Sequence, residues 1–256
     1  MIKSFFLFLP LSAILFVSCA TNPVSVSKTG ETQIDTTPQP QSESLVANGK
    51  RTFDVYKRTK ATVSNSQVSR VGNRIQRVVP LQSAEWEFVT FDNTTPNAFA
   101  LPGGKVGVHT GIIPIAKNDA GLATILAHEI AHVSLNHHDQ SSTRSTVTGL
   151  LGAVANAALG AGVGQIVQTG ANLGYSLPNS RKNEIAADQV GLMFMARAGY
   201  DPREAINFWQ RFSDYKSANG GGAGTEFLST HPLDTTRIGK LHEIMPIAVA
   251  EYNKNR

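Results

Sequence analysis

The alternation of apolar and polar residues predicts two helices in the first part of the chain. Between residues 63 and 79, apolar residues recur three or four positions apart, and Pro80 ends the pattern. Residues at this spacing share one helix face, and proline breaks a helix interior. The stronger pattern covers 119–137, where Asn118 or Asp119 can cap the first turn. Both stretches are therefore expected to be helices.

Extended patterns lie between these two helices. Residues 85–91 alternate as a strand does, and two more extended runs, 97–101 and 105–109, are joined by Pro102-Gly103-Gly104. Two runs joined by turn-forming residues are typical of a β-hairpin. Three further helical patterns cover 181–198, 202–216 and 232–244. Together these elements predict one α+β domain that is mostly helical.

Composition and charge change this picture little. The chain has 256 residues, enough for one well-filled domain, and a formal net charge of +4. Its lysines and arginines are scattered, and no basic stripe is interleaved with aromatic residues. Such a stripe is typical of nucleic-acid interfaces, so no nucleic-acid partner is expected.

The first residues have the pattern of a secretory signal peptide. Lys3 precedes a short apolar run that contains Pro10 and ends at Ser18 and Cys19. The run is shorter than the ~20 residues that a membrane-spanning helix needs. An uncleaved N-terminal membrane anchor is the alternative interpretation.

Cys19 is the only cysteine, so no intramolecular disulfide can form. Residues 15–19 resemble the lipobox of bacterial lipoproteins, although Phe16 is bulkier than the usual residue there. The resemblance implies cleavage after residue 18 and lipid attachment to Cys19, which would anchor the protein to a membrane. Ala20, in place of Asp, implies sorting to the outer membrane, with the protein facing the periplasm. Cleavage elsewhere, leaving a free thiol, is the alternative.

Two segments lack the pattern of a packed core. Residues 19–45 are rich in Thr, Ser, Gln and Pro, which predicts a flexible tether ahead of a domain at 46–256. Residues 145–180 contain no charged residue and many glycines. That segment is long enough to span a bilayer, but its asparagines and glutamines favour a packed helix or a mobile cover over a cleft. Membrane insertion or self-association stays open for it.

The helix at 119–137 carries the residues with the clearest chemistry, in the sequence His128-Glu129-Ile130-Ala131-His132. Residues four apart share a helix face, so His128 and His132 can bind one metal ion. Zinc suits imidazole nitrogens, and a catalytic zinc site keeps one position for water. Glu129 can take a proton from that water and pass it to the leaving amine of a peptide bond. The motif predicts a metallopeptidase centre with one Zn²⁺ per chain.

The motif needs a third ligand, for which Glu184 is the best candidate. Glu184 opens a helical run and lies four residues before Asp188, so both carboxylates share a face. Asp188 can then accept a hydrogen bond from a ligand imidazole and fix its tautomer. The alternative ligand is His138, which lies ten residues after His128, the spacing of metzincins. Leu135 stands where metzincins have glycine, although Asn136 could end the helix.

The order His-Glu-x-x-His and then Glu-x-x-Ala-Asp resembles a group of gluzincin peptidases. The group includes the type II CAAX prenyl endopeptidase, the bacterial heat-shock protease, mitochondrial Oma-type proteases and periplasmic lipoprotein quality-control proteases. The resemblance begins at about residue 65 and implies a zincin-like domain with a small sheet beside the active-site helix. Because the chain shows neither several membrane helices nor a helical-repeat domain, it is most similar to the small periplasmic lipoprotein branch.

The same resemblance implies roles for two further segments. Asn97, Ala98, Phe99 and Ala100 match the strand that borders the active-site cleft, to which substrate would add as an extended strand. Thr230-His231-Pro232, with Arg237 five residues after Pro232, matches a late His-Pro segment of the family. His231 would then either stabilise the tetrahedral oxyanion or occupy the open zinc position in a latent state.

These features predict a zinc metalloendopeptidase that cleaves unfolded or misassembled cell-envelope proteins. The substrate class rests on the resemblance and the expected location, and no residue pattern indicates it. Two other functions stay open: a zinc-binding chaperone or assembly factor whose proteolysis is latent, and a structural lipoprotein with an accidental motif. Glu129 argues against the chaperone, because zinc binding does not require it.

Overall fold

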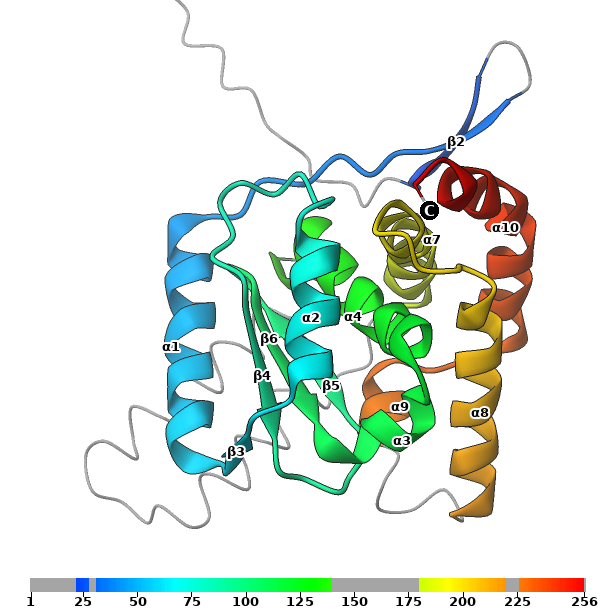
Figure 1. The fold of residues 1–256 in the computed structure, drawn as a ribbon. Helices are drawn as coiled ribbons and strands as arrows, with labels where there is room; N and C mark the ends of the chain where they lie inside the picture. The colour runs from blue at the N-terminus through cyan, green and yellow to red at the C-terminus, as the bar shows by residue number, and fades with distance from the viewer. Residues whose placement is uncertain (1–21, 28–30, 140–179, 220–225, 256) are drawn as a thin grey trace, which may run out of the picture.

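The computed structural model describes residues 22–27, 31–139, 180–219 and 226–255 (Figure 1). The strands are β1 (Val24–Val26), β2 (Thr32–Ile34), β3 (Thr62–Val63), β4 (Glu87–Phe91), β5 (Ala98–Leu101) and β6 (Lys105–His109). The longer helices are α1 (Glu43–Thr59), α2 (Ser66–Gln76), α4 (Asp119–Ser134), α7 (Arg181–Arg197), α8 (Glu204–Ala218) and α10 (Thr235–Asn255). The short turns of helix are η1 (Thr110–Ile112), α3 (Ile113–Ala116), η2 (His137–Asp139) and α9 (Glu226–Thr230).

The central sheet has the strand order β3-β4-β6-β5. Strands β4 and β6 are parallel, whereas the pairs β3–β4 and β5–β6 are antiparallel. The β5–β6 pair is the hairpin predicted from the sequence. Its turn needs glycine, because Gly103 and Gly104 have φ angles of +80° and +85°. Strand β5 is therefore left at an edge of the sheet.

Helices cover both faces of this sheet: α1 lies on one side, and α2 and α4 lie on the other (Figure 1). Successive side chains of a strand point to opposite faces. Phe99 therefore packs with Phe53 of α1 in a small aromatic cluster, whereas Ala98 and Ala100 belong to the main core with α4. The main core continues through α4 to α7, α8 and α10.

Helices α4 and α7 lie side by side at the centre of the molecule. Every residue of α4 from Gly121 to Ser134 is buried, and so is almost every residue of α7 from Asn183 to Ala196. Gly191 permits the close approach, because a Cβ atom there would lie 3.0 Å from the backbone of Ala127. Polar residues on these two helices consequently face protein and not solvent.

The fold class predicted from the sequence, a mostly helical α+β domain with a small sheet beside the motif-bearing helix, is confirmed. The helix predicted at 63–79 is shorter, because residues 62–63 form β3 and Asn65 caps α2 at Val68. The last helix extends beyond residue 244 and continues through Pro246 to Asn255. Helix α1 and the short helix α9 have no counterpart in the prediction.

The described part of the predicted tether differs from the expectation of a free, flexible chain. Strands β1 and β2 pair as a hairpin, and Val24 and Ile34 pack against the main core. Farther along, Gln39 N–H donates to Ser134 O at 2.7 Å, and Gln41 Nε2 donates to Val133 O at 2.7 Å. Ser134 O is among the last carbonyls of α4, which the helix itself leaves without a donor, whereas Val133 O also accepts from Asn136 N–H. Residues 39–41 thus complete the C-terminus of the central helix.

The predicted signal peptide, Cys19 and nearly all of the uncharged segment 145–180 lie outside the described residues. Within the part of the chain that the structure does describe, no helix is both long enough and apolar enough to cross a bilayer.

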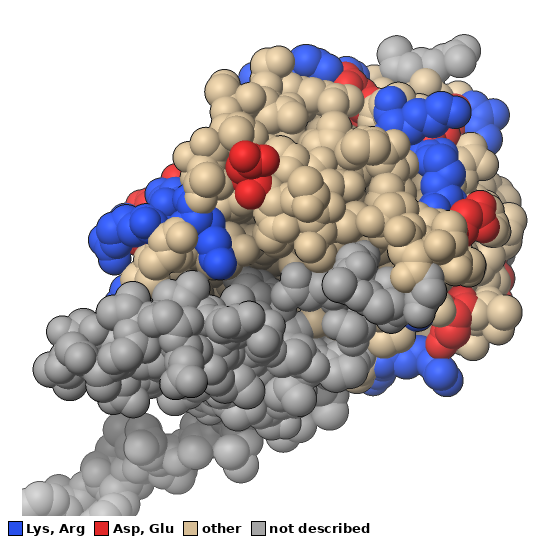
Figure 2. All heavy atoms as spheres, turned by 90° about the horizontal axis from the view of Figure 1, so that it is seen from below, with Lys and Arg blue, Asp and Glu red and all other residues tan. Residues whose placement is uncertain are grey.

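One face of the molecule shows how its charges are distributed (Figure 2). Lysine, arginine, aspartate and glutamate side chains are interspersed around its margin, and a broad area between them is uncharged. The visible part of this face, apart from the grey atoms, carries no continuous patch of one sign.

Candidate metal centre

Helix α4 places His128, Glu129 and His132 in the interior of the protein. Its first turn is capped by the Asn118 side chain, which accepts from Gly121 N–H at 2.8 Å. The three motif side chains are at most 3% exposed. One helical turn separates the two histidines, and their Nε2 atoms lie 3.1 Å apart. The spacing in the sequence thus yields the pair of facing imidazoles predicted from it.

Helix α7 and the segment between α9 and α10 supply the opposite side of the site. Glu184 lies in the first turn of α7, and its Oε1 atom is 3.2 Å from His132 Nε2. His231 follows α9, and its Nδ1 atom is 3.0 Å from Glu184 Oε1 and 3.4 Å from His128 Nε2. The donor atoms of His128, His132, Glu184 and His231 all lie within 4.8 Å of one another.

The donor set fits a divalent cation such as zinc. Three imidazoles and one carboxylate are ligand types that zinc prefers, and here they converge on one point. Burial alone would lower the pKa of His128, but Asp188 and Glu184 raise it to about 9. These two carboxylates therefore stabilise a positive charge at the position where the donor atoms meet. Glu129, Glu184 and Asp188 are buried, and the buried Arg237 pairs with Glu184 and Asp188. Three acidic groups and one guanidinium leave two negative charges, which a divalent ion would balance.

Arg237 of α10 connects the groups behind the donors. Its Nε and Nη2 atoms donate to Asp188 at 2.7 and 2.8 Å, and Nη1 lies 2.9 Å from Glu184 Oε2. Nη1 also donates to the carbonyls of His231 and Pro232. Although burial opposes its charge, the two carboxylates raise the pKa of the guanidinium. One buried cation thus holds together α7, the His-Pro segment and α10.

The environments of Asp188 and Glu129 bear on the roles predicted for them. Asp188 Oδ1 lies 2.9 Å from His128 Nδ1, so it can accept that N–H and leave Nε2 to face the donors. Burial opposes ionisation of Asp188, but Arg237 lowers the pKa of this carboxyl below its ordinary value. Burial raises the pKa of Glu129, only partly offset by His231 and His128. A carboxyl with a raised pKa is suited to taking up and releasing a proton.

The predicted substrate strand lies beside Glu129. His109 N–H donates to Asn97 O at 2.9 Å, so alternate residues of β5 bond to β6 and the backbone groups of Ala98 and Ala100 point to the open edge. Ala100 N–H donates to Glu129 Oε2 at 3.2 Å. Phe99 points to the far face of the sheet, into the aromatic cluster. Only the alanines of this segment can therefore meet a ligand at the edge.

His138, the alternative ligand, does not join the donor group. Leu135 keeps a right-handed conformation, and Asn136 takes the left-handed turn, with φ +52°. The chain then enters η2, where the His138 ring hydrogen-bonds to the backbone of Ala100. Burial lowers the pKa of His138 to about 4, against the effect of this hydrogen bond.

Sequence reasoning missed two residues of the site, Arg237 and His137. Arg237 was matched to the late His-Pro segment without a role, and its position in α10 gives no sign of burial. His137 Nδ1 lies 2.9 Å from His132 Nδ1, and burial lowers the pKa of His137 to about 3. A left-handed Asn followed by histidine, directly after the motif helix, is the signal that could have identified it.

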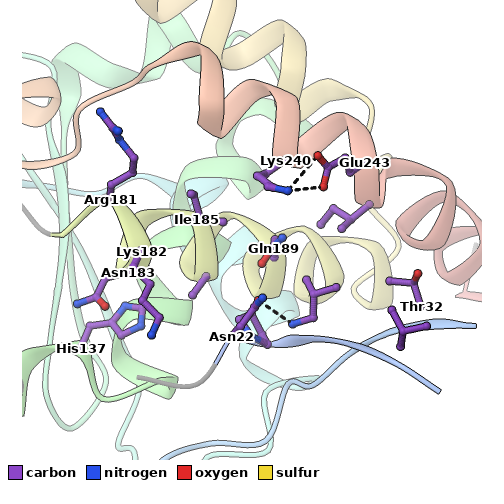
Figure 3. Close-up of a pocket in the computed structure, with 15 residues that line it drawn as sticks. Asn22, Thr32, His137, Arg181, Lys182, Asn183, Ile185, Gln189, Lys240 and Glu243 are labelled. Carbon is purple, nitrogen blue, oxygen red and sulfur yellow. Dashed lines mark hydrogen bonds and ion pairs between the residues drawn. The ribbon is translucent and has the colours of Figure 1, made fainter. Parts of the chain in front are cut away.

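A cavity of about 700 Å³ lies near the site, between the β1–β2 hairpin, α7 and α10 (Figure 3). Ile185, Gln189 and Ile244 are among its lining residues, and Lys240 and Glu243 form an ion pair on the wall drawn uppermost in Figure 3. His137, Lys182 and Asn183 lie together at one end. None of the four metal-donor residues lines the cavity, so His137 is the link between the two.

Comparison with known proteins agrees with this geometry. The model of peptidase family M48 matches residues 62–245, from β3 into α10. The chain belongs to this family. The match covers the His128–His132 motif and the helices that bring Glu184, Asp188 and His231 to it, and so all four residues of the donor group.

Similar proteins include metalloendopeptidases of mitochondria and a bacterial protease. The mitochondrial metalloendopeptidase OMA1 of Saccharomyces cerevisiae is 39% identical over 180 residues, which cover 68% of this chain and 51% of that protein. OMA1 of Schizosaccharomyces pombe is 41% identical over 182 residues, or 71% of this chain and 53% of that protein. The β-barrel assembly-enhancing protease of Escherichia coli K12 is 28% identical over 195 residues, which cover 71% of this chain and 40% of that protein. The chain thus spans about half the length of these two OMA1 proteins. Their names agree with the enzyme class expected from the motif, a metalloendopeptidase.

Proposed function

We propose that the protein is a zinc-dependent endopeptidase whose metal is held by His128, His132 and Glu184. The observation that carries the proposal is the convergence of these donors, with His231, within 4.8 Å in the protein interior. When bound, zinc would polarise the scissile carbonyl and make water a stronger nucleophile. The chain belongs to a peptidase family, which supports the same reaction class.

Glu129 is the proton carrier in this proposal. It lies next to the first ligand in α4, and burial raises its pKa, so it is a stronger base than an exposed carboxylate. Glu129 takes a proton from the attacking water and transfers it to the leaving amine. Asp188 holds His128 in the tautomer that presents Nε2 to the metal, and Arg237 keeps Asp188 ionised.

The contacts of His231 favour the latent arrangement over the catalytic one. Its Nδ1 atom lies among the donors, and Nε2 is 3.5 Å from Glu129 Oε1, where an attacking water would need room. Phe227 stacks on the ring, with the centroids 4.4 Å apart. In this proposal His231 occupies the open metal position and must withdraw before substrate binds. If it stays beside the site after withdrawing, it would be able to donate a hydrogen bond to the oxyanion.

Substrate is proposed to bind as an extended strand along β5. The outward-facing backbone groups of Ala98 and Ala100 can bond to its backbone, which selects for extended, unfolded chain and not for particular side chains. Because Ala100 N–H donates to Glu129 and the Ala100 backbone also bonds to the His138 ring, strand addition would compete with both bonds. The arrangement places the added strand beside the proton carrier.

The natural substrates proposed are unfolded or misassembled envelope proteins, cleaved at the periplasmic face of the outer membrane. This part rests on the lipobox-like residues 15–19 and on similarity to the β-barrel assembly-enhancing protease. A domain at 46–256, a signal peptide at 1–18 and a lipid on Cys19 belong to the same proposal. Radiolabelled palmitate incorporated by the wild type and not by Cys19→Ala would support it, and equal labelling of both would refute it.

The test of the central proposal separates metal binding from catalysis. Zinc content is measured by elemental mass spectrometry on the full chain, beside Glu184→Ala and Glu129→Gln. We expect one zinc per wild-type chain, much less in Glu184→Ala, and full zinc without casein cleavage in Glu129→Gln. Absence of zinc from the wild type after reloading would refute the proposal. If Glu129→Gln fully restored the biological function in cells that lack the protein, the chaperone or assembly role would be favoured instead.

A further inference from the structure

His132 has an unusual partner for a metal ligand. Its Nδ1 atom faces His137 Nδ1 at 2.9 Å, with the ring planes at 73°, while its Nε2 atom faces the other donors. For Nε2 to keep a lone pair for the metal, Nδ1 must carry the proton and donate it. His137 is then the acceptor in this hydrogen bond. Metal-bound histidines more often donate to a carboxylate or a carbonyl.

The backbone after α4 is built to bring His137 to this position. In a continuous helix of 3.6 residues per turn, side chains five apart point about 140° away from each other and do not meet. Asn136 interrupts the helix with φ +52°, and the chain turns back so that the two rings make contact. The Asn136 side chain donates to Pro40 O at 2.6 Å, which fixes the turn against residues 39–41.

The wall of the cavity holds His137 from the other side. Figure 3 shows its ring at one end of the cavity, with Lys182 and Asn183 of α7 at the same end. His137 is only 4% exposed. A ring confined between α7 and His132 has little freedom to rotate, so its Nδ1 atom stays directed at the ligand.

An imidazole in this role also preserves the charge of the centre. His128 already has a carboxylate partner, Asp188, whose charge is paired with Arg237. An aspartate in place of His137 would add a negative charge beside His132. The described residues supply no buried cation that would pair with it. A neutral imidazole acceptor orients His132 without that addition.

We propose that His137 is a positioning residue for the metal centre, which fixes the tautomer and ring orientation of His132 by accepting its Nδ1 hydrogen bond. The inference rests on the proposed zinc site and adds to it a residue outside the ligand set. Outer partners of this kind typically change metal affinity by about tenfold to a hundredfold.

The test measures zinc affinity of the full chain by competition with a chromogenic chelator. His137→Phe keeps an aromatic ring and removes the acceptor, so its Kd for zinc should rise about tenfold to a hundredfold. His137→Gln offers a neutral carbonyl acceptor and should recover most of that loss. His138→Phe, the matched control, removes the next imidazole of η2, which is not among the donors and should leave the Kd unchanged.

A second readout is the visible absorption of the Co²⁺-substituted protein, which reports ligand geometry without any activity. We expect shifted bands for His137→Phe and a wild-type spectrum for His138→Phe. Far-UV circular dichroism and thermal unfolding of each variant verify that it is folded. If His137→Phe is unfolded, His137→Leu serves in its place, because it also removes the acceptor and should raise the Kd for zinc and shift the Co²⁺ bands in the same way.

The outcomes separate the inference from the proposed function. If the wild type binds no zinc, both the proposed function and the proposed role of His137 are refuted. If the wild type binds zinc and folded His137→Phe binds it equally well with an unchanged Co²⁺ spectrum, only the role of His137 falls. The role also falls if His137→Gln is as weak as His137→Phe, or if His138→Phe weakens binding to the same degree.

Discussion

The two sides of the metal centre are held in place by different means. His128, Glu129 and His132 come from consecutive turns of one buried helix, so the helix backbone alone sets their relative positions. Glu184, Asp188 and His231 come from α7 and the end of α9, and they are held by Arg237. The first side depends on local hydrogen bonds, and the second depends on one side chain. We therefore expect a single substitution to disrupt the second side of the centre much more easily than the first.

Loss of Arg237 should have the largest effect on stability. Arg237→Met would leave Asp188 and Glu184 buried without their cation, and breaking such a pair costs about 3–5 kcal/mol. Urea unfolding of the two proteins measures the difference. Arg197→Met is the control, because Arg197 pairs with Glu251 near the surface, where a pair contributes about 0–1 kcal/mol. Equal losses in the two variants would contradict the special role of Arg237.

The contact between the two sides can be tested at Gly191. In Gly191→Ala the new Cβ would lie 3.0 Å from the backbone of Ala127 and His128, so α7 must move away from α4. Overpacking of this kind costs about 1–3 kcal/mol, and it should also weaken zinc binding by separating Glu184 from the histidines.

The control for that experiment is Gly239→Ala in α10, where a Cβ would meet nothing within 4 Å. That variant should gain about 0.5–1 kcal/mol, because alanine favours a helix more than glycine does. Wild-type stability and zinc affinity in Gly191→Ala would show that the two helices tolerate separation.

The smallest change in stability is expected for a substitution on the face of the sheet that packs against α1. Tyr56→Phe removes the hydrogen bond between Tyr56 Oη and His109 Nε2, 3.1 Å long, and keeps the ring in the aromatic cluster. Stability should fall by about 0.5–1.5 kcal/mol, as for a typical hydrogen bond. Zinc affinity should not change, since neither side of the centre contacts this cluster. A weaker metal site in Tyr56→Phe would show that the sheet transmits strain to α4.

The same contrast explains what the sequence could predict. The facing pair His128 and His132 follows from a four-residue spacing, and the carboxylates of α7 follow from the need for a third ligand. Arg237 and His137 depend on tertiary packing, so no periodicity marks them. Helix α1 was missed for a related reason: its buried face includes Gly49 and Thr52, which add nothing to an apolar pattern. Gly49 is there because a Cβ would collide with Pro102 O.

The N-terminal stretch shows the limit of composition as a guide. Residues 39–41 have the polar, proline-rich character of a linker, yet they donate to the last carbonyls of α4 and accept from Asn136 and Gly103. Their polarity is used for hydrogen bonds to a buried helix end. The amino-acid composition shows that these residues are polar, but it does not show which groups they bond to.

Those bonds also give the molecule a mechanical property. A pull on the chain ahead of residue 39 reaches Gln39 and Gln41 before it reaches α1, which begins at Glu43. The force would therefore be applied to the C-terminal turn of α4, two residues beyond His132. Because the β1–β2 hairpin packs against the core and Thr36 accepts from Arg197 of α7, tension would first have to release these contacts, and it would then act on α4 before it reached α1.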